Sequence, residues 1–166
     1  MFEMTRDDPK FDAETASSHE PSSPPSVGGG EDVFRFVRVP TPLTVGEELV
    51  MRRVIGAAIA VHRELGPGFM ETIYRRAMCQ ELSYREIAYE TERRVAVKYR
   101  NAVVGEHRFD LLVNGLVVVE LKAVAASNPV HRAQVLSYLR AARLRAGLVI
   151  NFRVALLKEG LERIVL

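Results

Sequence analysis

The sequence lacks the features that mark disulfide-rich secreted proteins, membrane proteins and zinc ribbons. Cys79 is the single cysteine, which excludes an intrachain disulfide framework and any multi-cysteine metal site. The longest uninterrupted apolar stretch, Val54 to Val61, has eight residues, whereas a bilayer span needs about 20. The first ten residues, MFEMTRDDPK, lack the basic start and apolar run of a secretory signal. We therefore expect a soluble cytoplasmic domain.

Charge and composition divide the chain into two parts. Its 166 residues suffice for one ordinary domain and a tail. Residues 1–45 hold four basic and eight acidic residues (net −4), and residues 46–166 hold 19 and 13 (net +6). Between Ser17 and Gly30, eleven of fourteen residues are Ser, Pro or Gly, a composition that buries too little apolar surface to fold. We predict a disordered acidic tail and linker over residues 1–43 and a domain over residues 44–166.

Two further features of the tail bear on its role. The stretch Val33–Val39 alternates weakly between apolar and basic residues. It is either part of the linker, which we favour, or a short strand. An acidic tail beside a basic domain also suits a protein that meets a polyanion.

Hydrophobic periodicity predicts an α/β domain in which helices flank a central mixed β-sheet. Thr44 and Glu47 have the spacing of a capping box, which starts a helix that Gly66 and Pro67 end. After a second helix the period changes to that of strands, and a third helix separates these strands from the last ones. The expected helices cover residues 44–65, 70–84 and 129–147, and the expected strands cover residues 93–100, 106–113, 116–124, 148–152 and, at an edge, 161–166.

Several catalytic motifs are absent from the sequence. The segment Gly66–Glu71 begins like a dinucleotide-binding fingerprint, but Glu71 stands where the third glycine belongs and a helix precedes it. There is no phosphate-binding loop with Lys-Ser/Thr, no GxSxG elbow and no HExxH helix, and the four histidines show no paired zinc spacing. A serine or cysteine hydrolase, or a small-molecule enzyme of other chemistry, has no motif to support it.

Charged residues interrupt two neighbouring apolar strands. Val117–Val119 is apolar enough for a central strand, and Glu120 and Lys122 follow it, two apart and so on one side. Asp110 interrupts the preceding strand in the same manner, and ionised groups at such positions need a partner or a metal. Two carboxylates suit Mg²⁺, or Mn²⁺, which binds through them and a substrate phosphate, while a lysine orients the attacking water or neutralises a phosphate oxygen. The alternative is an internal ion pair, Glu120 with Lys122 or Asp110 with Arg108.

The residues around these strands resemble a known family. The segment Gly68–Tyr74 (GFMETIY) matches the signature of the GxxExxY protein family, a branch of the PD-(D/E)XK nuclease-like superfamily. The resemblance covers roughly residues 47–166 and includes VHRELGPGFMETIY, FDLLV, VVVELKAV, HRAQVLSYL, GLVINF and GLERIVL. It implies a restriction-endonuclease-like PD-(D/E)XK core that acts on nucleic-acid phosphodiesters. Tyr74 lies near an apolar stripe, so we expect it to pack with its hydroxyl tethered.

The resemblance also implies a role for each acidic residue. Asp110 and Glu120 would be the metal ligands, Lys122 the catalytic lysine, and Glu71 an additional acidic ligand. Glu71 has a structural alternative, because a carboxylate in the first turn of a helix is favoured by the dipole and Arg75 stands four residues on.

The third helix carries a polar stripe. Gln134 and Tyr138 form a Gln-x3-Tyr pair similar to the helix motif of bacterial recombination nucleases, in which it orients the lysine or contacts DNA. His131 lies on the same stripe, at spacings of three and seven. The stripe either lines a substrate cleft, with Gln134 supporting catalysis and His131, Arg132 and Tyr138 binding substrate, or is a solvated face.

The hairpin turn at Asn114-Gly115 sets a geometric condition. A strict two-residue turn would pair residues whose numbers sum to 229, so Asp110 would face Val119 and point away from Glu120. The site requires a three-residue loop or a bulge that shifts the sum to 230, and Gly115 allows either.

We expect a Mg²⁺-dependent nuclease that hydrolyses nucleic acid, preferably DNA, with a metal-activated water and no covalent intermediate. The alternative is a catalytically silent module that binds nucleic acid or a protein on the same fold. Because so small a domain offers little surface for sequence readout, a homodimer or a protein partner is a further expectation.

Overall fold

Seven strands and three α-helices make up the part of the chain that the computed structural model describes, residues 42–126 and 128–166. The predicted tail up to residue 41 and the stretch Val33–Val39 lie outside the described residues. No helix of the described part is both long and apolar enough to cross a bilayer. The elements are α1 (Val45–Leu65), α2 (Glu71–Tyr84), β1 (Tyr89–Thr91), β2 (Arg94–Tyr99), β3 (Ala102–Arg108), β4 (Leu111–Val113), β5 (Val117–Lys122), α3 (Pro129–Ala142), β6 (Ala146–Asn151), the 3-10 turn η1 (Leu157–Glu159) and β7 (Leu161–Val165).

A five-stranded mixed sheet forms the centre, in the order β1-β4-β5-β6-β7. Only β5 and β6 pair in parallel, because α3 connects them, and the other neighbours are antiparallel. Strands β2 and β3 form a separate two-stranded sheet. The α/β class with a mixed central sheet and flanking helices, expected from the sequence, is confirmed.

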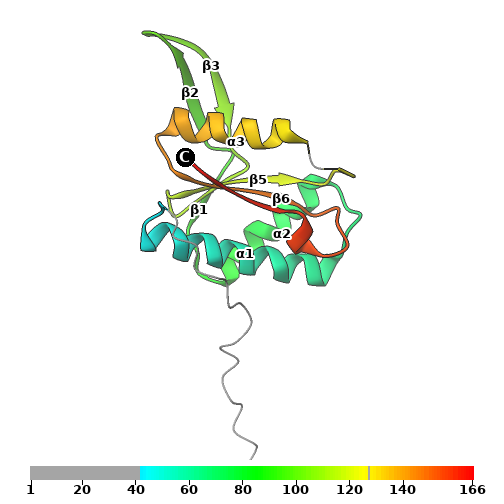
Figure 1. Cartoon of the computed structure of the whole chain (residues 1–166). Helices are drawn as coiled ribbons and strands as arrows, with labels where there is room; N and C mark the ends of the chain where they lie inside the picture. Colours follow the sequence, from blue (N-terminus) through cyan, green and yellow to red (C-terminus); the bar gives the residue numbers. More distant parts are fainter. Residues whose placement is uncertain (1–41, 127) are drawn as a thin grey trace, which may run out of the picture. The chain divides into compact units, whose positions relative to one another are not determined.

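The two faces of the sheet are covered by different helices (Figure 1). Helices α1 and α2 pack on one face and α3 packs on the other. Along β5, Val117, Val119 and Leu121 belong to the core under α1 and α2, whereas Val118 belongs to the core under α3. Because side chains alternate along a strand, Glu120 and Lys122 lie on the α3 face. Both charged side chains therefore lie on the face of the sheet that α3 covers.

The predicted start and end of the first helix are confirmed. The amide of Glu47 donates to Thr44 Oγ1 (3.2 Å), and the Thr44 amide donates to Glu47 Oε2 (2.7 Å), which completes the capping box. Gly66, at the other end, has φ of 67° and donates its amide to the His62 carbonyl. The left-handed backbone that glycine tolerates thus ends the helix.

Two element boundaries differ from those predicted. Helix α3 ends at Ala142, not at Gly147, because Arg143 adopts a left-handed conformation (φ 56°) and Gly147 lies within β6. The strand predicted over residues 106–113 is divided at Phe109 and Asp110 into β3 and β4, which belong to different sheets. The short strand β1 and the first half of β3 were not expected from the pattern.

Gly147 allows α3 to approach the sheet closely. A Cβ atom at this position would lie 2.6 Å from Val135 Cγ1 and 3.4 Å from Leu139 Cδ1, both on α3. Gly147 pairs with Val118 of β5, two positions before Glu120. The same close contact therefore sets the distance between α3 and the strand that carries the charged residues.

The substitution Gly147→Ala should lower the free energy of unfolding by about 1–3 kcal/mol, because the added methyl overpacks this contact. Urea unfolding followed by circular dichroism measures the change. Gly105→Ala is the control, since a Cβ there meets nothing within 4 Å and the change should be small. The double variant Val135→Ala/Gly147→Ala lacks the Val135 methyls that the new methyl would meet. Its loss of unfolding free energy should therefore be smaller than the sum of the losses in the two single variants. Additive effects would contradict this account of Gly147.

Candidate active site

The pairing of β4 with β5 brings Asp110 and Glu120 to one face of the sheet. Leu111 pairs with Val119 and Val113 with Val117, so the residue numbers sum to 230. The connection is a three-residue loop, in which Asn114 and Gly115 have φ of 50° and 66°. Extended by one residue beyond the last pair, this register places Asp110 opposite Glu120, and the charge of Asp110 acts on the Glu120 carboxyl. The register that the site requires is therefore the one observed, and the strict two-residue turn is not formed.

Asp110 is fixed by two different elements. Its Oδ2 accepts a hydrogen bond from the backbone amide of Leu121 (2.9 Å), next to Glu120 on β5. Its Oδ1 lies 3.5 Å from a guanidinium nitrogen of Arg75 on α2. The carboxylate is thus held between the strand that carries Glu120 and the helix that begins at Glu71.

Glu120 is the most constrained acid of the group. Its residue is only 4% exposed, and its Oε1 accepts a hydrogen bond from Lys122 Nζ at 2.6 Å. Its Oε2 is buried and has no hydrogen-bond partner among the described residues. Burial raises the pKa of Glu120 to about 7, and the charges of Asp110 and Glu71 add to this rise, while the bond from Lys122 opposes it.

Lys122 completes the charge balance of the cluster. Burial alone would lower the pKa of its ammonium group, but the hydrogen bond to Glu120 and the charges of Glu120, Glu71 and Asp110 outweigh burial and raise that pKa. The side chain therefore stays protonated at neutral pH. Two cations, Lys122 and Arg75, face the three carboxylates of Glu71, Asp110 and Glu120, so the cluster is net negative when all three are ionised.

Glu71 enters the cluster from the first turn of α2. Burial raises the pKa of its carboxyl, Asp110 raises it further, and Lys122 and Arg75 lower it. The loop before it is tied down by Tyr74, whose hydroxyl donates to the Gly66 carbonyl (2.7 Å) and accepts from the Phe69 amide (3.2 Å). Tyr74 is fully buried, as expected of a packing residue with a tethered hydroxyl. Glu71 thus lies on the chain between Phe69 and Tyr74, which are hydrogen-bonded to each other.

Helix α3 covers the cluster with the predicted polar stripe. The Gln134 amide donates to the Tyr138 hydroxyl, and no hydrogen bond joins it to Lys122. Burial and the charge of Glu120 raise the pKa of Tyr138, and burial and the charge of Lys122 lower that of His131. His131 Nδ1 is buried without a hydrogen-bond partner among the described residues. The stripe therefore faces the carboxylates and is not a fully solvated face.

Arg132 is not brought into the cluster. Its guanidinium donates to Glu162 Oε1 of β7 at 2.7 Å, and the side chain is half exposed. Its role in substrate binding stays a prediction.

Arg75 is the basic residue whose role the sequence did not reveal. It was expected to pair with Glu71 four residues earlier, but it forms ion pairs with Asp110 (3.5 Å) and with Glu92 (3.3 Å). Arg108, the expected partner of Asp110 in an internal ion pair, instead lies 3.5 Å from Glu92. Only the Glu120–Lys122 pair of that alternative is formed.

The donor set fits a hard divalent cation with few protein ligands. Among the described residues, no group of three His, Cys, Asp or Glu side chains is arranged to hold a metal ion. Mg²⁺ keeps several waters and is often bound by one or two protein carboxylates plus substrate oxygens. Asp110 and Glu120 can supply these two carboxylates. The unpartnered Oε2 of Glu120 is a buried oxygen that such a cation would satisfy.

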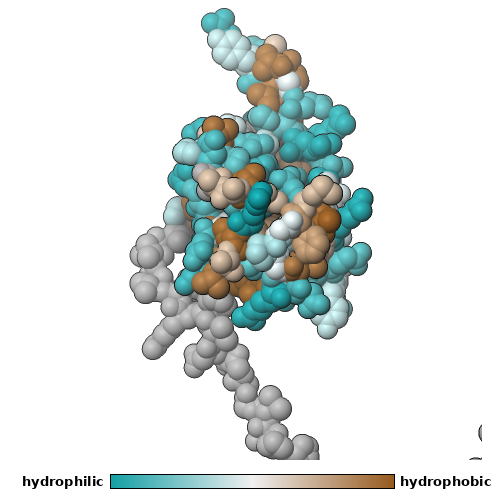
Figure 2. Space-filling model, turned by 90° about the vertical axis from the view of Figure 1, so that its right-hand side faces the viewer, coloured by the Kyte–Doolittle hydropathy of each residue, from teal (hydrophilic) through white to brown (hydrophobic). Residues whose placement is uncertain are grey.

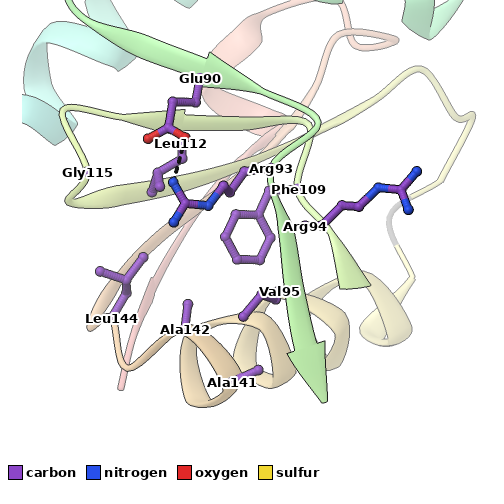
Figure 3. Close-up of a pocket in the computed structure, with 10 residues that line it drawn as sticks. All are labelled: Glu90, Arg93, Arg94, Val95, Phe109, Leu112, Gly115, Ala141, Ala142 and Leu144. Atoms are coloured by element: carbon purple, nitrogen blue, oxygen red, sulfur yellow. Dashed lines mark hydrogen bonds and ion pairs between the residues drawn. The ribbon is translucent and has the colours of Figure 1, made fainter. Parts of the chain in front are cut away.

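A cavity of about 330 Å³ lies apart from this cluster, near the end of α3 (Figure 3). In Figure 3 the Phe109 ring lies in the middle of the labelled lining residues, and a dashed line marks the Arg93–Glu90 ion pair (2.6 Å). Asp110, Glu120 and Lys122 do not line this cavity. The lining residues are Glu90, Arg93, Arg94, Val95, Phe109, Leu112, Gly115, Ala141, Ala142 and Leu144.

A comparison with protein families agrees with this arrangement. The model of the PD-(D/E)XK nuclease superfamily matches residues 48–164. The chain belongs to this superfamily. Its match contains every residue of the cluster, from Glu71 to Tyr138. Comparisons with curated proteins and with solved structures give no significant match.

The burial of Glu120 predicts a pH-dependent stability. Its pKa of about 7 in the folded protein lies above the ordinary value of 4.5, so the folded state holds this proton more tightly. The stability contributed by the protonated form is present below pH 4.5 and is lost as pH rises through 7. Between about pH 5 and pH 8, the stability of Glu120→Gln relative to the original protein should increase by about 2–3 kcal/mol.

Urea unfolding at several pH values measures this difference. Glu64→Gln on the exposed surface of α1 is the control, and its stability should follow that of the original protein at each pH. Parallel curves for Glu120→Gln and the original protein would show that burial does not raise the Glu120 pKa.

Proposed function

We propose that this PD-(D/E)XK domain is a Mg²⁺-dependent nuclease that hydrolyses phosphodiester bonds of nucleic acid, with DNA favoured over RNA. The observation that carries the proposal is the buried, unpartnered Oε2 of Glu120, directly beside Lys122 and on the same face as Asp110. A cluster that served only to neutralise charge would leave no buried carboxylate oxygen unpaired.

Each residue of the cluster has a defined task in this proposal. Asp110 and Glu120 would hold the cation, and Glu71 would complete the acidic side of the site. A bound divalent ion lowers the pKa of a coordinated water and stabilises charge on the phosphoryl group. Lys122 would donate hydrogen bonds to the attacking water or to a phosphate oxygen, and its raised pKa keeps it protonated for this task.

The polar stripe of α3 supports the same chemistry. Gln134 and Tyr138 form one hydrogen-bonded unit that covers Glu120 and Lys122. His131 stands nearer the start of α3, where burial and the charge of Lys122 lower its pKa. The oxygen of the attacking water bonds to phosphorus and releases a proton to solvent. The phosphorus–oxygen bond to the leaving nucleotide breaks, and the leaving oxygen takes up a proton from solvent.

The signature segment supports a narrower assignment. We propose that the chain belongs to the GxxExxY branch of the superfamily, because the segment Gly68–Tyr74 has a structural reason for its spacing. The glycine (φ 122°) turns the loop, Glu71 enters the site, and Tyr74 fastens the loop three residues later.

A silent binding module is the competing candidate, and the Glu120–Lys122 ion pair favours it. In that case the pair neutralises two buried charges and nothing more. Cation binding and cleavage separate the two candidates.

A divalent cation should stabilise the folded protein. At ten times its dissociation constant, Mg²⁺ or Mn²⁺ should add about 1.4 kcal/mol, or roughly 4 °C in melting temperature. Asp110→Asn and Glu120→Gln should lose this shift, whereas Glu64→Gln should keep it. Thermal melting at pH 8 with and without EDTA measures the effect. An equal shift in all four proteins would place the cation elsewhere.

The protein should cleave DNA in Mg²⁺ or Mn²⁺ and not in EDTA. Lys122→Met, which keeps the aliphatic stem, and Asp110→Asn should each reduce the rate by about 100-fold or more. Comparing the cleavage rates on single-stranded DNA, duplex DNA, circular DNA and RNA identifies the substrate. Circular dichroism shows whether each variant is folded. Cleavage that survives both substitutions would reject the assigned site, and folded protein that binds DNA without product would identify the silent module.

A further inference from the structure

Strands β2 and β3 form an arm that continues a hairpin of the central sheet. The pairs Tyr89–Val113 and Arg94–Arg108 belong to one register, since the residue numbers sum to 202 in both. Two backbone hydrogen bonds connect the halves, from Glu92 to Asp110 (3.2 Å) and from Phe109 to Arg93 (3.0 Å). The ribbon bends at this point and projects past α3 (Figure 1). We call residues Arg94–Arg108 the β2–β3 arm.

The arm touches the rest of the domain only near its base. Val95 packs against the core under α3, and the His107 ring lies 4.8 Å from that of Tyr138. Beyond this point the tip is exposed, including Tyr99 (66%), Val103 (59%) and Val104 (60%). Figure 2 shows this projecting end, in which hydrophobic and hydrophilic side chains lie next to each other. A segment that served only the domain's own core would not expose an aromatic ring and two valines.

The charge of the arm is strongly one-sided. It carries four basic residues and one acidic residue, a net charge of +3 with histidine neutral. Arg94 pairs with Glu106 at 3.3 Å, and both side chains are exposed. Lys98 and Arg100 at the tip have no acidic partner among the described residues, and the Arg100 guanidinium lies 5.6 Å from the centre of the Tyr99 ring. The unpaired cations therefore gather where the arm is farthest from the body.

We propose that the β2–β3 arm is a docking element for duplex DNA, which it contacts through the backbone phosphates with Lys98 and Arg100. This inference rests on the proposed function, because it assigns how the substrate is held. The charge argues against a second copy of the chain as the occupant, since two arms of +3 would repel each other. A two-stranded ribbon enters the major groove of B-DNA, about 12 Å wide, and a seven-residue strand extends about 20 Å.

The arm also leads directly to the active-site cluster. Asp110 follows the last residue of β3 by two positions, and Phe109 between them packs against Tyr138 at 5.3 Å. Arg108 at the base of the arm and Arg75 beside Asp110 share Glu92 as an ion-pair partner. Basic side chains thus lie at the tip of the arm and again at its base beside the carboxylates, so a duplex that contacts both has its backbone directed toward the site.

The test measures DNA binding separately from cleavage. The full-length protein is titrated into a fluorescent duplex of about 30 base pairs in EDTA, between about 50 and 200 mM salt. Lys98→Gln/Arg100→Gln should bind at least about ten-fold more weakly, and the slope of log K against log salt should fall by about two. Lys98→Glu/Arg100→Glu should bind still more weakly. Melting temperatures of the variants should match that of the original protein.

The control removes the same charge on the opposite side of the domain. Arg52→Gln/Lys158→Gln changes two exposed basic residues, on α1 and η1, and should leave affinity and slope nearly unchanged. The proposal is overturned if Lys98→Gln/Arg100→Gln binds the duplex as tightly as the control variant does. It is also overturned if the original protein does not bind the duplex, or if that protein is a dimer that the substitutions Val103→Ser/Val104→Ser dissociate.

The outcomes also separate this inference from the proposed function. Arm-dependent binding by a protein that never cleaves the duplex in Mg²⁺ would support the arm and reject the nuclease. If the protein cleaves the duplex in Mg²⁺ but the arm substitutions leave its affinity for the duplex unchanged, the nuclease is supported and the role of the arm in DNA binding is rejected.

Discussion

The pairing register between β4 and β5 is the constraint on which the rest of the site depends. Side chains alternate along a strand, so a shift by one residue would turn Asp110 away from the face of the sheet on which Glu120 lies. The three-residue loop between Val113 and Val117 sets this register, and its residues Asn114 and Gly115 adopt positive φ. The length of one short loop thus decides whether the two carboxylates lie on the same face of the sheet.

The cluster is an electrostatic compromise that folding alone does not explain. A carboxylate as buried as Glu120 weakens the fold when it is ionised, and Lys122 relieves only one of its two oxygens. Arg75, from another element, offsets the charge of Asp110. The domain therefore holds an acidic site that the fold tolerates rather than one that stabilises it. Such stored unfavourable charge is typical of functional sites, and a bound cation would relieve it.

Sequence patterns predicted the elements whose signals are local. The capping box at Thr44 and the hydrophobic run of β5 are readable because each depends on residues within a few positions. The predicted end of α3 at Gly147 was wrong. Glycine is typical of helix ends, but Gly147 instead allows a close contact with Val135 that only the tertiary structure creates. The Arg75–Asp110 ion pair was missed for the same reason, because it joins residues 35 positions apart. The three-residue β1 is too short to show a period.

The continuous register of the ribbon has a consequence for how this domain can vary. The two strands leave the sheet and return to it as partners, joined at the bend by their own backbone hydrogen bonds. Adding or deleting one residue pair near the tip would therefore lengthen or shorten the ribbon without shifting any pairing below it. The bulge between Val97 and Lys98 shows that an unmatched residue, Val104, is already absorbed there. The chemistry at the base and the reach of the tip can thus change independently of each other during evolution.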